Sequence, residues 1–178
     1  MKTLRRALTA LALALALTLA LPAGSVEPLP DGGRRPAVAG FSATASVVPG
    51  LGLRKTADLE MGAVTPGDTA GSITVSPDDT SRYAAGGVSA AASSWSAARF
   101  AVSGGAGAEA SRLRVSLPDR VVLSGGSAGE TLTARAFTSR LVGSAAGLEL
   151  VVGATVDVGA AQPTGRYTGT FTVTVNES

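Results

Sequence analysis

The stretch of sequence that decides the fold is residues 165–176, Gly-Arg-Tyr-Thr-Gly-Thr-Phe-Thr-Val-Thr-Val-Asn. Its apolar residues, Tyr167, Phe171, Val173 and Val175, alternate with threonines. Period-two alternation of aromatic and β-branched residues is typical of a strand with one buried face. Gly169 interrupts the apolar face, which predicts a bulge or a close backbone approach at that point.

Short segments of the same kind recur along the preceding sequence. They are residues 41–47, 51–54, 59–64, 71–75, 99–103, 112–117, 121–123, 131–137, 148–152 and 155–158. Turn signals separate them, including Thr65-Pro66-Gly67-Asp68. Residues 82–88 are ambiguous, and residues 90–98 predict a loop or one helical turn. Many short strands divided by turns indicate an all-β sandwich or barrel, and the alternation favours antiparallel sheets.

The N-terminus has the three-part pattern of a secretory signal peptide. A basic start is followed by an Ala/Leu run of about 15 residues, shorter than the roughly 20 that a membrane-spanning helix needs. We therefore expect a signal peptide at residues 1–23, cleaved after Ala20 or Ala23, and no stable membrane span afterwards. Residues 24–40 are rich in Pro and Gly and predict a linker or N-terminal extension, which leaves residues 41–178 as one domain.

Charge and cysteine content restrict the partners and the chemistry. The chain has 15 basic and 13 acidic residues, but loss of Lys2, Arg5 and Arg6 with the signal leaves 12 against 13, a net charge of −1. Apart from Arg34-Arg35 no basic tract remains, so we expect no nucleic-acid partner. The chain contains no cysteine, so an exported domain must fold without disulfides.

The residue inventory argues against catalysis. The sequence contains no histidine and no cysteine, which excludes Ser-His-Asp and Cys-His catalysis and zinc sites built from nitrogen or sulfur ligands. A Ser-Lys dyad would depend on Lys55 alone, since Lys2 lies in the signal. We expect no enzyme activity, no catalytic, cofactor-binding or metal-binding residues, and no cofactor.

Three features stay open as weaker site hypotheses. The acids Asp78-Asp79 fall in a turn that contains proline, where such residues usually cap backbone groups, although a calcium site or a catalytic pair are alternatives. Asp58 and Glu60 flank the start of a strand. Trp95, the single tryptophan, is expected to pack against the core, with stacking on a sugar or a partner as the alternative.

Several segments, taken in order and at their spacing, resemble the bacterial family called domain of unknown function 4402. They are residues 59–62, 71–75, 97–104, 150–158 and 165–176. The resemblance implies an exported, immunoglobulin-like antiparallel β-sandwich, similar to the pilin-like and spore-coat-type domains of bacteria. It supplies no catalytic residues. In pilins an N-terminal extension of one subunit completes the sheet of the next, but the prolines before Phe41 make this extension a poor donor strand.

These observations lead to two functional expectations. The first is a non-enzymatic, exported structural or surface protein, a fimbria-like or coat-like subunit whose partners are itself or other envelope proteins joined by strand addition. The alternative is a monomeric binding module for a carbohydrate or another envelope component. Both place the protein in the periplasm, at the cell surface or outside the cell.

Overall fold

The structure is a computed structural model that describes residues 36–47, 51–78, 81–104, 112–126, 129–144 and 147–177. The chain divides into two units, Met1–Gly33 and Arg34–Ser178. The predicted signal peptide (1–23) and all but the end of the predicted linker (24–40) lie outside the described residues. Within the described ranges, no helix is long and apolar enough to cross a membrane.

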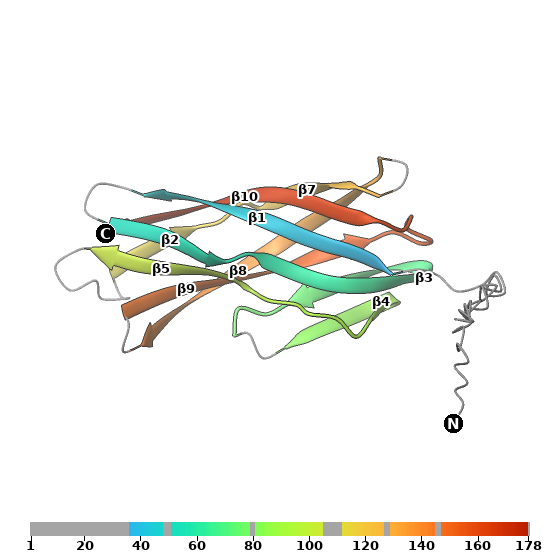
Figure 1. Cartoon of the computed structure of the whole chain (residues 1–178), viewed down its shortest axis with the longest axis horizontal. Helices are drawn as coiled ribbons and strands as arrows, with labels where there is room; N and C mark the ends of the chain where they lie inside the picture. The colour runs from blue at the N-terminus through green and yellow to red at the C-terminus, as the bar shows by residue number, and fades with distance from the viewer. Residues whose placement is uncertain are drawn as a thin grey trace, which may run out of the picture. The chain divides into compact units, whose positions relative to one another are not determined.

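In this part of the chain the regular structure consists of ten strands that form one sheet (Figure 1). They are β1 (Ala37–Val47), β2 (Leu51–Ala57), β3 (Leu59–Val75), β4 (Arg82–Ala90), β5 (Ala98–Gly104), β6 (Leu113–Ser116), β7 (Arg120–Gly125), β8 (Thr131–Ser144), β9 (Gly147–Val158) and β10 (Arg166–Glu177). β1 begins before the Phe41 start expected from the alternation. The segment that follows β4 is a loop without a helical turn.

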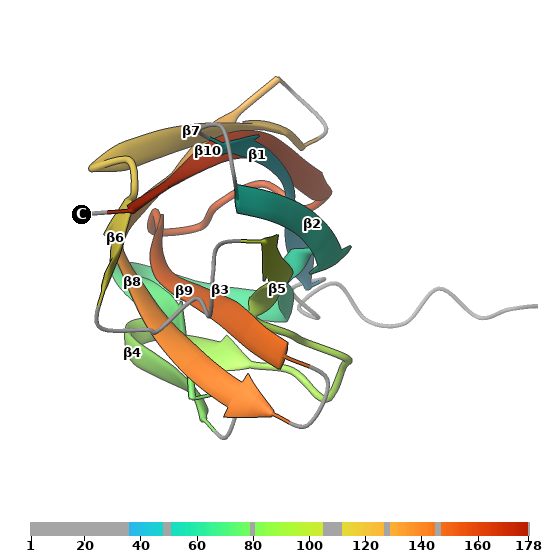
Figure 2. The same ribbon diagram turned by 90° about the vertical axis from the view of Figure 1, so that its left-hand side faces the viewer.

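Six of the strands close on themselves to form a barrel, in the order β1, β3, β9, β8, β7, β10 and back to β1. The view of Figure 2 shows them arranged around a common interior. β4 extends the sheet from β3, and β5 with β2 extends it from β9. The all-β class is therefore confirmed, and the described strands form a closed barrel where an immunoglobulin-like sandwich was expected.

Long, bent strands explain why the sheet closes instead of splitting into two layers. β9 pairs with β5 along Leu148–Val152 and with β3 along Ala154–Val158. The same edge of β9 therefore pairs with two different strands in succession. β3 likewise passes from β1 to β9. Register shifts in β3 and β8 supply the local bends that closure requires.

The first and last strands of the domain lie beside each other in parallel. β1 pairs with β10 from Val38↔Arg166 to Val47↔Val175, whereas an antiparallel sheet was expected throughout. No hairpin joins these two strands, so chain connectivity does not impose the antiparallel direction. On its other edge β10 pairs with β7 and β6. The terminal strand is thus an interior strand of the barrel, completed by the chain's own β1.

Two positions at which the sequence predicts a break between strands lie inside continuous strands in the structure. The expected turn at Thr65-Pro66-Gly67-Asp68 lies inside β3, where a register shift between Pro66 and Gly71 lets the chain bulge without reversing. β9 continues through Gly153. Gly169 of β10 is a close approach and not a bulge, because a Cβ there would lie 3.0 Å from the carbonyl oxygen of Val122 and the register with β1 does not shift.

A bulge in β8 determines which of its side chains enter the core. Strict alternation would place Ala136 inside and Phe137 outside. The register shift between Arg135 and Thr138, with Ala136 at φ 49°, leaves Ala136 exposed and packs Phe137 against the core. Its ring lies 5.2 Å from that of Phe171 and 6.4 Å from that of Phe41.

Tyr167 anchors the start of β10 through its hydroxyl group. The side chain is fully buried, and its hydroxyl donates to the carbonyl oxygen of Pro163 at 2.7 Å and accepts from the amide of Gln162 at 3.0 Å. This pairing satisfies a buried hydroxyl and ties the turn after β9 to the core.

We expect Tyr167→Phe to lower the free energy of unfolding by about 1–2 kcal/mol, because the ring keeps its packing while two polar partners lose a hydrogen bond. Urea unfolding followed by circular dichroism measures the change. Tyr83→Phe is the matched control, since Tyr83 is 56% exposed, and its loss should stay below about 0.5 kcal/mol. Equal losses in the two variants would show that the Tyr167 hydroxyl does not anchor the turn.

Candidate functional site

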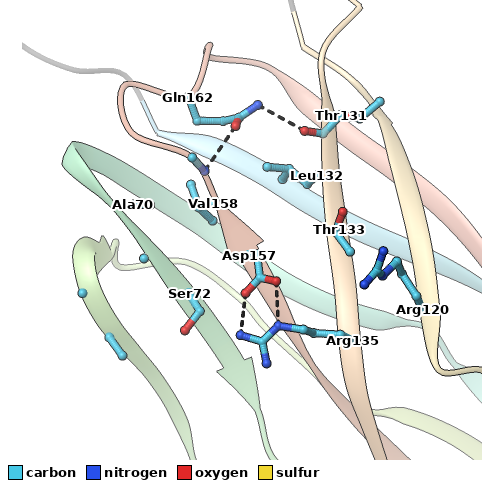
Figure 3. Close-up of a pocket in the computed structure, with 14 residues that line it drawn as sticks. Ala70, Ser72, Arg120, Thr131, Leu132, Thr133, Arg135, Asp157, Val158 and Gln162 are labelled. Carbon is cyan, nitrogen blue, oxygen red and sulfur yellow. Dashed lines mark hydrogen bonds and ion pairs between the residues drawn. The ribbon is translucent and has the colours of Figure 1, made fainter.

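A hollow on the outside of the barrel lies over β3, β4, β7, β8 and β9 (Figure 3). It is an open groove of about 750 Å³, and we call it the arginine groove. Strand register places its polar residues in a row, because Ser72 is opposite Asp157 and Asp157 is opposite Thr133. Volumes of this size are typical of ligand sites, although those are usually more enclosed.

Arg135 and Asp157 form a two-pronged ion pair in the arginine groove. The Arg135 Nε atom donates to Asp157 Oδ2 at 2.6 Å, and Nη2 donates to Oδ1 at 2.8 Å. These hydrogen bonds, with the charge of Asp157, raise the pKa of Arg135 above its usual value. Both side chains are exposed to solvent, so the pair contributes little to stability. It does hold the Arg135 guanidinium in a fixed orientation, with Nη1 outside the two-pronged pair.

Arg120 lies directly opposite Arg135 in the β7–β8 ladder. Residues opposite each other in antiparallel strands project to the same face with Cβ atoms about 5 Å apart, and like charges in this arrangement are destabilising. Figure 3 shows both side chains on the groove. Among the described residues, Arg120 has no hydrogen-bond or ion-pair partner. The charged side chains lining the groove are Arg120, Arg135 and Asp157, which give it an excess of one positive charge.

Uncharged polar groups cover the remainder of the arginine groove. Ser72, Thr131 and Thr133 bring hydroxyl groups to its lining, and Leu132 and Val158 are apolar. Gln162 at one end accepts from the Gly159 amide at 3.3 Å and donates to the Tyr167 hydroxyl. The groove therefore combines fixed cationic donors with neutral hydroxyl groups.

Backbone strain is found next to this groove. In the described residues the non-glycine positions with positive φ are Ala136 at 49° and Ala161 at 50°. Each adjoins a lining residue, Arg135 in one case and Gln162 in the other. Such conformations cost roughly 1–3 kcal/mol and cluster at binding sites, where they aim side chains.

The structure uses the predicted acidic candidates in other ways. Asp58 forms an ion pair with Lys55 at 2.7 Å, and its Oδ1 atom also accepts from the Ala43 amide at 3.3 Å. Glu60 is exposed, and both acids line a second hollow of about 400 Å³ together with Arg166. Lys55 is thus engaged with a carboxylate.

The two remaining candidates from the sequence lie elsewhere. Asp78 is exposed in a turn, where its carboxylate accepts from the Ser81 hydroxyl at 3.5 Å, while Asp79 lies outside the described residues. Trp95 is half-buried and packs against the core, the role that was favoured for it. In the residues that the structure describes, no three acidic, histidine or cysteine side chains gather as a metal site would require.

Sequence reasoning missed the arginine groove. No sequence pattern marks Arg120 or Asp157 as a site residue, and the alternation identifies Arg135 only as a polar position of a strand. The available signal was the run Thr131, Thr133, Arg135 on one predicted face. Its partners come from β3, β7 and β9, and only the tertiary pairing brings them together.

The fold and the groove together define a closed all-β domain with a cationic, hydroxyl-lined surface groove. A family model described as "Domain of unknown function (DUF4402)" matches residues 51–176, so the chain belongs to that family. The match extends from β2 to β10 and begins after β1. No curated protein and no solved structure matches the chain.

Proposed function

We propose that this chain is a non-enzymatic, exported structural protein of the cell surface, a fimbria-like or coat-like subunit that joins copies of itself or other envelope proteins by strand addition. The absence of histidine and cysteine from the sequence supports a non-enzymatic role. The predicted signal peptide supports export.

The observation that carries the assembly proposal is the outer edge of β4. In the described part of the chain the edge strands are β2, β4 and the four-residue β6, which carries Arg114, whereas both edges of β10 are paired. β2 carries the exposed charges Arg54 and Lys55, which discourage pairing with another chain. β4 has no charged residue after Arg82 and exposes Tyr83. The β4 edge is therefore the better site for an added strand.

The expected result is a concentration-dependent oligomer in sedimentation velocity that Tyr83→Lys abolishes, because a charge on the added-strand edge opposes pairing. Val122→Lys is the matched control, since Val122 on β7 is 55% exposed and does not lie on β4. A wild-type protein that stays monomeric up to its solubility limit, or an oligomer unaffected by Tyr83→Lys, would refute assembly through β4.

A second candidate function is a binding module for a carbohydrate or another envelope component. The arginine groove favours it, because the groove offers fixed donors and hydroxyl groups on an accessible face. The version of this hypothesis that relied on Trp95 loses support, since that side chain packs against the core.

A further inference from the structure

We propose that the arginine groove binds an acidic saccharide, with a carboxylate of the sugar held between Arg120 and Arg135. The inference rests on the second candidate function, the binding module, and names its ligand class. It does not depend on whether the chain assembles through β4.

The first step is the excess of positive charge among the side chains that line the groove. Arg120 and Arg135 occupy directly opposite positions of the β7–β8 ladder, and the single carboxylate of Asp157 balances only one of these two positive charges. Asp157 binds Arg135 through Nε and Nη2, which leaves Nη1 of Arg135 and the whole guanidinium of Arg120 outside that pair. A bound anion that contacts both guanidinium groups would relieve the repulsion. Local violations of this kind are expected at functional sites.

The second step is the orientation of the donors. Arg135 is oriented from one side by its two hydrogen bonds to Asp157, and the register shift of β8 begins directly after it. Guanidinium groups bind carboxylates through paired N–H donors, and a fixed guanidinium loses less entropy when it does so. The groove is thus pre-organised for a planar anion.

The third step concerns what surrounds the anion. Ser72, Thr131 and Thr133 offer hydroxyl groups, and Asp157 offers carboxylate lone pairs, around the two arginines. These groups suit the many hydroxyls of a sugar ring, each of which needs a donor or an acceptor. An acidic peptide would instead favour apolar pockets for its side chains, and the buried apolar residues of the lining are limited to Leu132 and Val158. A uronic acid joins the carboxylate and the hydroxyls in one ligand.

The experiment is titration calorimetry of the purified chain with trigalacturonic acid. Its methyl ester, which keeps the sugar and removes the charge, and inorganic phosphate are the comparison ligands. We expect the acid to bind, the ester to bind at least tenfold more weakly, and added salt to weaken binding.

Arg120→Gln should weaken binding about tenfold, the loss expected when a hydrogen bond to a charged group is removed. Arg140→Gln, an exposed arginine of the same strand β8 that does not line the groove, should change it less than twofold.

Arg120→Glu separates ligand binding from damage to the fold. A glutamate opposite Arg135 forms a favourable cross-strand pair, so we expect the midpoint of thermal unfolding to rise by about 1–3 °C while binding is lost. Loss of binding together with loss of the folded signal would instead assign Arg120 a structural role and overturn the proposal.

The remaining outcomes are also decisive. If the ester binds as tightly as the acid, the groove is a neutral-sugar site, so the binding module stands and the acidic ligand is wrong. If phosphate binds as tightly as the trisaccharide, the groove is a general anion site and the saccharide is wrong. If none of the three ligands binds, the acidic-saccharide proposal is refuted, and the binding module loses the groove that favours it.

Discussion

Gly153→Ala is expected to lower the free energy of unfolding by about 3 kcal/mol, the upper part of the range for overpacking a close contact. A Cβ at this position would meet the backbone of the segment that ends β3, lying 2.8 Å from the Pro77 nitrogen and 2.9 Å from the Ser76 carbonyl carbon, with the Val75 carbonyl oxygen closer still. The Val75 backbone is held by pairing with β4 and β9, so it cannot move aside as a flexible side chain can.

The position of Gly153 in the ladder explains why a single methyl group has this effect. β9 pairs with β5 up to Val152 and with β3 from Ala154 onward, so Gly153 lies where its edge changes neighbours. The β3–β9 pairing is the one that closes the barrel. A methyl group there pushes apart the two strands whose contact distinguishes a barrel from an open sheet.

Gly143→Ala is the matched control, because a Cβ at Gly143 of β8 would meet nothing within 4 Å. This variant should stay within about 0.5 kcal/mol of the wild type. Urea unfolding of the two variants measures both free energies. A Gly153→Ala protein as stable as Gly143→Ala would show that β3 and β9 do not approach as closely as the barrel requires.

The local structure of this chain could be predicted largely from its sequence. The alternation of β10 gave the correct buried face, since Tyr167, Phe171, Val173 and Val175 are all buried. Period-two patterns are sufficient here because each strand has one face toward the core. At Gly169, where a bulge or a close backbone approach was expected, the structure has the close approach.

The connections between strands could not be predicted in the same way. Pro and Gly mark bulges as well as turns, so Thr65–Asp68 indicated a chain reversal where β3 only bulges. The sandwich and the barrel share the same strand pattern, and they differ in which distant strands pair. The parallel β1–β10 contact and the β3–β9 closure are such long-range pairings, which local patterns do not encode.

The arginine groove was hidden for the same reason. Arg120 and Arg135 belong to different strands, and only the β7–β8 register makes them direct neighbours. The bulge at Ala136 adds a second difficulty, because it exposes a residue that alternation assigns to the core and turns Phe137 inward. One irregularity therefore separates a groove residue, Arg135, from a core residue two positions later.

Phe171→Ala is expected to be the most destabilising of the substitutions considered, with a loss of about 4 kcal/mol. The ring is 2% exposed and packs edge-on against Phe41 at 6.2 Å and in a tilted arrangement against Phe137 at 5.2 Å. It thereby joins β10, β1 and β8, three of the strands that form the barrel. Truncation leaves a cavity at the point where these strands meet, and favourable ring contacts are lost with it.

Such a loss is a large part of the roughly 5–15 kcal/mol that stabilises a typical domain, so the variant should unfold at a much lower urea concentration. Thr172→Ala is the matched control on the same strand, because its side chain is exposed on the opposite face, and it should lose less than about 0.5 kcal/mol. Phe171→Leu should fall between them, at about 1–1.5 kcal/mol, since most of the volume is kept. If Phe171→Ala and Phe171→Leu lower the free energy of unfolding equally, the lost aromatic contacts and not the cavity account for the loss. If both variants are as stable as Thr172→Ala, the three rings do not form the core of the barrel.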